Sequence, residues 1–173
     1  MLDKKATVVT LQNIAIVIGA FTCGFYFTKS FHEPTSYVGG LWSVISGIIV
    51  IESTHIKTWH SSKNRILGTL IGAIISGIYL YLFDFSLLGY AVSIAFGVMA
   101  CYVFKAQASI KLTGITISVI LIVSTIESEL HPFMNAGLRF VESAIGTMIA
   151  LLTAIITYRL ERAISRQKNL DAT

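Results

Sequence analysis

The chain has 173 residues, of which 54% are hydrophobic and only 13% are charged, and its mean hydropathy is +0.75. About a quarter of the residues in soluble domains are charged, so this composition excludes an ordinary soluble domain and indicates an integral membrane protein. The formal net charge of +4 comes from lysines and arginines scattered among loops between apolar segments. We interpret them as topology signals that face anionic lipid, and we expect no nucleic-acid partner.

Six apolar segments are expected to cross a hydrocarbon core about 30 Å thick. They cover residues 10–31, 37–56, 65–83, 86–104, 112–126 and 133–158. The fifth is rich in Ile, Val and Thr and resembles a strand, but an isolated strand cannot satisfy its backbone in lipid. We therefore predict an all-α membrane protein, a single transmembrane domain of six transmembrane helices that spans residues 1–173.

The connecting segments set the orientation. The first apolar segment follows Lys4 and Lys5 and is interpreted as a retained helix, not a cleaved signal peptide. Basic loops at 57–64 and 105–111 and a basic tail at 159–173 fall on one side of the membrane, whereas residues 127–132 form an acidic turn on the other. All but Lys29 and Arg139 of the 13 lysines and arginines lie on the first side. The positive-inside rule places that side, with both termini, in the cytoplasm.

Small residues recur at helical spacing in the third segment. Gly68, Gly72 and Ser76 are four residues apart and form a ridge that lets a neighbouring backbone approach closely. A similar pattern begins 74 positions after Arg65, at Arg139. In the segment that follows Arg139, Gly146 and Ala150 form the ridge of small residues. We predict that these ridges are helix-packing surfaces.

The same offset divides the chain into two halves. Glu52 and Arg65 bracket one loop, and Glu127 and Arg139 bracket another. Because each half has an odd number of spans, three, the second half has the opposite orientation in the membrane. This predicts two three-helix inverted repeats, residues 10–83 and 86–158. Such repeats are typical of secondary transporters, whose site lies between the halves.

Two motifs resemble a known family. Trp42-Ser-Val-Ile-Ser-Gly-Ile-Ile-Val-Ile-Glu-Ser-Thr54 is followed by Arg65-Ile-Leu-Gly-Thr-Leu-Ile-Gly72, and Arg139-Phe-Val-Glu-Ser-Ala-Ile-Gly-Thr-Met-Ile-Ala150 stands near the end. Together they resemble the fusaric acid resistance and aromatic acid exporter (FUSC-like) proteins over residues 10–160. The resemblance implies a bacterial inner-membrane exporter of small organic, often aromatic, acids that is driven by the proton gradient. Larger relatives contain two six-span units, which implies a homodimer or another homo-oligomer here.

The chain departs from the family pattern in two ways. Glu52 stands where the family often has Gln, and the tail is too short for the soluble domain that many members carry.

Two arginines are candidate substrate-binding residues at the two mouths of a passage. Arg65 either attracts a carboxylate or snorkels to head groups from the cytoplasmic edge. Arg139 lies three residues before Glu142 on one helical face, so it either forms a fixed pair or offers its guanidinium to a competing carboxylate. Gln12 and Asn13, in the first segment, are further candidates for substrate binding or for linking helices.

Proton coupling calls for a carboxylate in a non-aqueous environment. Glu52 is the first candidate because we expect it well inside the second span, where ionisation is costly, and Glu142 is the second. The alternative for Glu52 is a helix end that touches cytoplasmic water.

Other chemistry is not indicated. The sequence contains no nucleophile with a base, no phosphate loop and no metal-ligand spacing among its four histidines, so we expect no enzyme, no cofactor and no metal. Cys23 and Cys101 are interpreted as small core residues, and Trp42 and Trp59 as interfacial anchors. The rival hypothesis is a non-transporting membrane module that uses its small ridges to oligomerise or to bind a partner.

Overall fold

In a computed structural model of the protein, which describes residues 4–127 and 130–170, all the regular structure is helical. The six α-helices are α1 (Lys4–Lys29), α2 (Ser36–Val50), α3 (His55–Leu82), α4 (Leu87–Val103), α5 (Ile110–Ile126) and α6 (Pro132–Leu170). Short 3-10 helices precede α2 and α5 at Glu33–Thr35 and Gln107–Ser109. Residues 128 and 129 of the predicted acidic turn, and 171–173 of the predicted tail, lie outside the described residues. The prediction of an all-α protein with six helices is confirmed.

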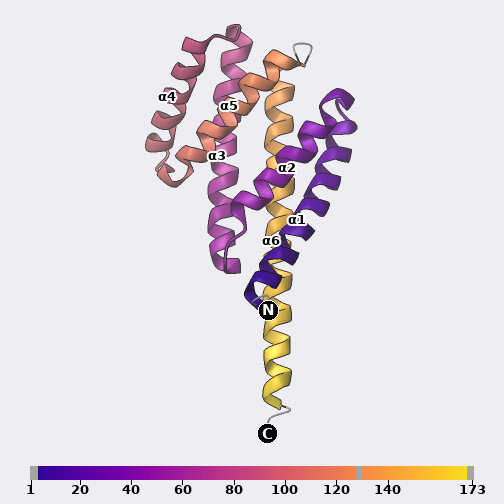
Figure 1. The fold of residues 1–173 in the computed structure, drawn as a ribbon. Coiled ribbons are helices and arrows are strands. Elements are labelled where there is room, and N and C mark those ends of the chain that lie inside the picture. The colour runs from indigo at the N-terminus through magenta and orange to yellow at the C-terminus, as the bar shows by residue number, and fades with distance from the viewer. Residues whose placement is uncertain (1–3, 128–129, 171–173) are drawn as a thin grey trace.

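Helices α3 and α6 lie side by side at the centre and run in opposite directions (Figure 1). Helix α2 crosses α6 obliquely, and α5 crosses α3 in the same manner. Helix α1 packs on α2 and α6, while α4 packs on α5 and α3. Every outer helix therefore contacts one of the two central helices.

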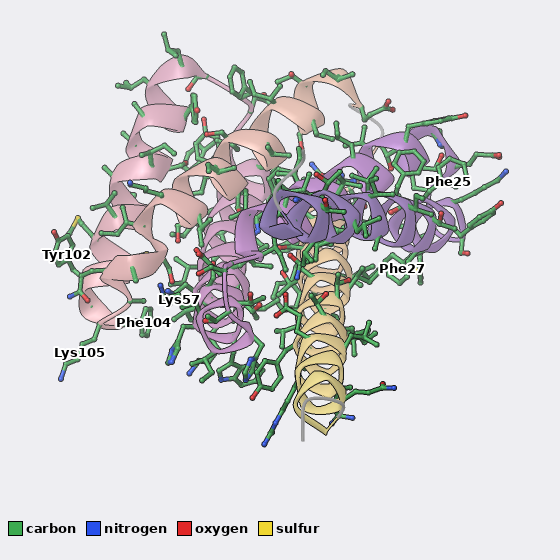
Figure 2. All side chains as sticks on the ribbon, turned by 60° about the horizontal axis from the view of Figure 1, so that its bottom comes forward. Phe25, Phe27, Lys57, Tyr102, Phe104 and Lys105 are labelled. Atoms are coloured by element: carbon green, nitrogen blue, oxygen red, sulfur yellow. The ribbon has the colours of Figure 1, made fainter. Side chains whose placement is uncertain are left out.

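The outer surface is apolar, as a lipid-facing surface must be. Leu87 and Leu88 are 78% and 75% exposed, and Figure 2 shows Tyr102 and Lys105 directed away from the helices at the end of α4. Four of the described helices, α1, α3, α5 and α6, are long and apolar enough to cross a membrane. Helix α4 is apolar but shorter, and α2, with 15 residues, reaches only about 22 Å. The protein is a membrane protein.

The predicted boundary between the second and third spans is wrong. Helix α2 ends at Val50, not near residue 56, because Ile51 adopts an extended conformation (φ −67°, ψ 126°). Thr54 then caps α3, its hydroxyl oxygen accepting the Lys57 backbone N–H at 3.3 Å. The predicted basic loop 57–64 therefore lies within the first three turns of α3, where Thr58 and Ser62 are buried.

Two further boundaries differ. Helix α5 begins at Ile110, inside the predicted loop, and α6 continues through the predicted tail to Leu170. The last turns of α6 extend beyond the other helices at the end of the bundle where α1 begins (Figure 1). The tail is long enough and free enough of Pro and Gly to continue the helix.

The interior where α2 meets α3 and α6 is polar. Among its buried side chains are Ser43, Ser46, Arg65, Thr69, Arg139, Glu142 and Ser143. Apolar clusters flank this region, one around Ile16 and Val50 and another around Ile120 and Ala136. A polar group inside such a protein must find partners, because neither lipid nor water supplies them.

Candidate functional site

Arg65, Arg139 and Glu142 all have zero exposure, and they come from the two central helices. The prediction that Arg65 and Arg139 stand at opposite mouths is wrong. Helix α3 begins at His55, so Arg65 lies ten residues inside it, about 15 Å along the axis. Its side chain is fully buried and contacts α6 and α2.

Arg65 is held by neutral groups alone. Its Nε donates to Ser143 Oγ at 3.0 Å, and its Nη2 donates to Ser46 Oγ at 2.8 Å. The guanidinium carbon lies 4.8 Å from the centre of the Trp42 ring, a cation–π geometry. The buried Nη1 has no hydrogen-bond partner, and no carboxylate of the described residues pairs with this arginine.

The serines that hold Arg65 also satisfy one another. Ser143 Oγ lies 3.1 Å from Thr69 Oγ1 and 3.2 Å from Ser46 Oγ, which in turn donates to the Trp42 carbonyl at 2.8 Å. The network joins α2, α3 and α6 through hydroxyl groups, which can act as donors or acceptors.

Arg139 and Glu142 form a buried ion pair one turn apart on α6. Arg139 Nη1 lies 2.8 Å from Glu142 Oε2, but the angles do not make a hydrogen bond, and Nε, Nη1 and Nη2 of Arg139 lack hydrogen-bond partners. Thr28, from α1, donates to Glu142 Oε1 at 2.6 Å. The carboxylate is therefore better satisfied than the guanidinium beside it.

Two side chains of α2 donate hydrogen bonds to the backbone carbonyls of this pair on α6. Trp42 Nε1 donates to the Arg139 carbonyl at 3.1 Å, and Ser43 Oγ donates to the Glu142 carbonyl at 3.0 Å. Gly146 permits the approach, because a Cβ there would overlap the Ser43 carbonyl oxygen. The site is closed in this conformation, with α2 forming one wall.

The cluster carries an unbalanced charge. Two arginines and one glutamate leave one net positive charge among the buried residues that the structure describes. An unpaired buried charge is costly, and unused N–H groups of guanidinium suit the planar oxygens of a carboxylate or a similar anion. The arrangement is thus chemically complementary to one small anion.

The other predicted site residues lie elsewhere. Asn13 donates to the Val9 carbonyl at 2.9 Å within α1, and Gln12 is half-buried on the same helix. Glu52 is exposed in the turn after α2, where its backbone N–H donates to Thr58. The premise that Glu52 lies well inside the second span is therefore wrong.

The small ridges have different neighbours. A Cβ at Gly68 or Gly72 would meet Ser109, Leu112, Thr113 or Thr116 on the α5 side, while buried Ser76 has a hydroxyl with no partner. Gly146 contacts α2, and Ala150 packs with Ile16 of α1 and Val50 of α2.

Sequence reasoning missed Ser46, Ser143, Thr28 and the role of Trp42, which is 3% exposed and not an interfacial anchor. Ser143 could have been found, since it follows Arg139 by four residues on the same helical face. No local signal identifies Thr28, which is 114 positions from Glu142.

Cysteine and metal chemistry do not enter the site. Cys23 and Cys101 are free; Cys23 is exposed, contrary to its predicted core position, and Cys101 is buried. No metal-binding group of His, Cys, Asp and Glu occurs in the part of the chain that the structure describes.

A family model described as fusaric acid resistance protein-like matches residues 22–153, which contain α2 to α5, the last part of α1 and the first half of the site-bearing α6. No curated protein matches the chain. No solved structure matches it either.

Proposed function

Because the chain belongs to the fusaric acid resistance protein-like family, a family of membrane transport and efflux proteins, we propose that it exports small organic anions through the Arg65–Arg139 site. The substrates are organic acids, including aromatic ones. The observation that supports this most directly is Arg65, a fully buried cation with an unused N–H and no carboxylate partner among the residues that the structure describes.

The two halves are proposed to be inverted repeats related by a pseudo-two-fold axis between α3 and α6. The α2–α6 crossing has its counterpart in the α5–α3 crossing, and the contact of α1 with α6 in that of α4 with α3. Successive helices of the first half run opposite to their counterparts in the second half (Figure 1). The 3-10 helices before α2 and α5 begin 74 positions apart, as Arg65 and Arg139 do.

Alternating access follows from this arrangement. Movement of α2 and α1 away from α6 would open the site from one side, and the equivalent movement of α5 and α4 away from α3 would open it from the other. Glycines at both crossings bring the backbones into contact, so each crossing can separate without withdrawing large side chains.

Glu142, not the exposed Glu52, is proposed as the proton-coupling residue. It is the one carboxylate within the buried cluster that the structure describes. When ionised, Glu142 pairs with Arg139, and a proton on Glu142 frees that guanidinium for a second carboxylate of the substrate.

The proposed setting is a bacterial inner membrane, with lipid around the apolar surface and the basic loops and both ends of the chain in the cytoplasm. Helix α1 begins at the end of the bundle where α6 ends, which agrees with termini on one side. A homodimer is proposed because larger relatives join two such units. The non-transporting alternative gives no reason for burying three charged side chains.

Efflux from proteoliposomes tests the proposal. Vesicles loaded with labelled benzoate, under an imposed pH gradient, should lose it faster with the wild-type protein than without protein. Arg65→Met should remove the added flux, whereas the exposed Glu52→Gln should retain it. The proposal is overturned if wild-type protein adds no flux for aromatic or aliphatic acids, or if folded Arg65→Met protein transports normally.

A further inference from the structure

Charge neutrality in the buried site can decide which anions it accepts. Elements packed around the cluster contribute Thr28 from α1, Trp42, Ser43 and Ser46 from α2, Arg65 and Thr69 from α3, and Arg139, Glu142 and Ser143 from α6. Only the two arginines and Glu142 carry charge. No further Asp, Glu, Lys, Arg or His is buried among residues 6–127, 130–163 and 167, whose side-chain burial the structure describes.

The missing second carboxylate has a structural origin. Glu142 follows Arg139 by three residues, and the corresponding position after Arg65 is Gly68. There α5 packs directly against the helix, since a Cβ on Gly68 would come within 2.8 Å of Leu112 Cβ. Within the described part of the chain, Arg65 therefore has no carboxylate to balance it, whereas Arg139 is paired with Glu142.

We infer that the site selects its substrate by net charge: it accepts a monoanion when Glu142 is ionised, and a dianion only when Glu142 carries a proton. The inference rests on the proposed function and specifies the substrate class of the same site. One monoanion brings the closed cluster to neutrality. A dianion leaves it one negative charge too many unless a proton enters with the substrate, and an uncompensated buried charge is costly.

The charge count gives the direction of the pH dependence. Binding of a dianion takes up one proton, so its affinity should rise about tenfold for each pH unit that the solution is acidified, in the range where Glu142 is ionised in the empty site. Binding of a monoanion takes up none, and its affinity should stay constant over that range.

Glu142→Gln should reverse the preference. The substitution keeps the side-chain shape and the acceptor oxygen for Thr28, but it raises the buried charge from one to two. A dianion then neutralises the cluster without a proton. Glu52→Gln removes a carboxylate from the exposed turn and serves as the matched control.

Calorimetric titration of the full chain in detergent, with benzoate and phthalate as probes, tests the inference at pH values where both are fully ionised. Wild type and Glu52→Gln should bind benzoate about tenfold or more tightly than phthalate at high pH, and the gap should narrow on acidification. Glu142→Gln should prefer phthalate by a similar factor, independent of pH.

The outcomes separate this inference from the function on which it rests. Wild-type protein that binds benzoate, but binds phthalate equally well and with no proton uptake, overturns charge selection and leaves the exporter intact. The same holds if folded Glu142→Gln keeps the wild-type preference. If Glu142→Gln does not fold, the wild-type pH dependence alone decides. Failure of the wild type to bind either probe contradicts both.

Discussion

The α2–α6 and α5–α3 crossings share a geometry but differ in chemistry. At the first, Ser43 and Ser46 of α2 face Glu142 and Ser143 of α6. At the second, the positions 74 residues later on α5 are Ile117 and Ile120, both fully buried. Glycines bring the backbones together at both crossings, with Gly146 at one and Gly72 at the other. Close packing of these helices therefore needs only small residues, and the polar groups at one crossing serve another purpose.

The largest expected effect separates the two arginines. Arg139→Met leaves Glu142 as an unpaired buried carboxylate and should lower the free energy of unfolding by about 3–5 kcal/mol. Arg65→Met removes a cation that no carboxylate of the described residues pairs with, and Ser46 and Ser143 keep other hydroxyl or carbonyl partners. The stability of this variant should therefore be nearly unchanged. Thermal unfolding in detergent measures the difference. If both variants lose the same stability, Arg65 contributes to folding as much as Arg139 does, and the predicted difference between the two arginines is wrong.

Glycine substitutions compare the crossings next. Gly146→Ala places a methyl group on the Ser43 backbone carbonyl and should cost about 3 kcal/mol. Gly72→Ala meets Thr116 Cβ at 2.8 Å and Thr113 O at 2.9 Å, a milder overlap, and should cost less. Gly137→Ala, with nothing within 4 Å, is the control, and the better helix propensity of alanine should leave it as stable as wild type or slightly more stable. A larger loss for Gly72→Ala would mean that the apolar crossing is the tighter one.

Thr28→Val tests the link from α1 to the charged pair. The variant keeps the side-chain shape but loses the hydrogen bond to Glu142 Oε1, which should cost about 2 kcal/mol because the acceptor is charged. Thr116→Val, at a buried threonine that bonds only the Leu112 carbonyl of its own helix, should lose less in the same thermal assay. If the two variants lose the same stability, the hydrogen bond to Glu142 contributes no more than the ordinary bond of Thr116.

The smallest expected effect is at Trp42. Trp42→Phe keeps an aromatic ring beside Arg65 but removes the N–H bonded to the Arg139 carbonyl, and should cost about 1 kcal/mol. The exposed Trp59→Phe is the control. Because Trp42 touches an arginine of each half, its substitution should also weaken benzoate binding. Unchanged affinity would remove Trp42 from the site.

Much of this site follows from local spacing. The 74-residue offset pairs Arg65 with Arg139, and three residues on one helix place Glu142 beside Arg139. The depth of Arg65 could not be predicted in this way, because polar Thr58 and Ser62 resemble a loop until their burial against other helices is known. The position of Glu52 could not be predicted from hydropathy either. The apolar run continues past Val50, where α2 ends, and Thr54 caps the start of α3.

The amino-acid sequence by itself determined a membrane protein of six helices, the small-residue positions where helices can approach, and the family to which the chain belongs. Hydropathy and helical periodicity are local properties, so they can be determined from the sequence of one chain. Only the tertiary structure decided that Arg65 lies among serines, with no carboxylate of the described residues paired with it, and that Thr28 and Trp42 contact α6 from distant segments. Those relationships depend on which faces pack together, and the balance of buried charge exists only after they have done so.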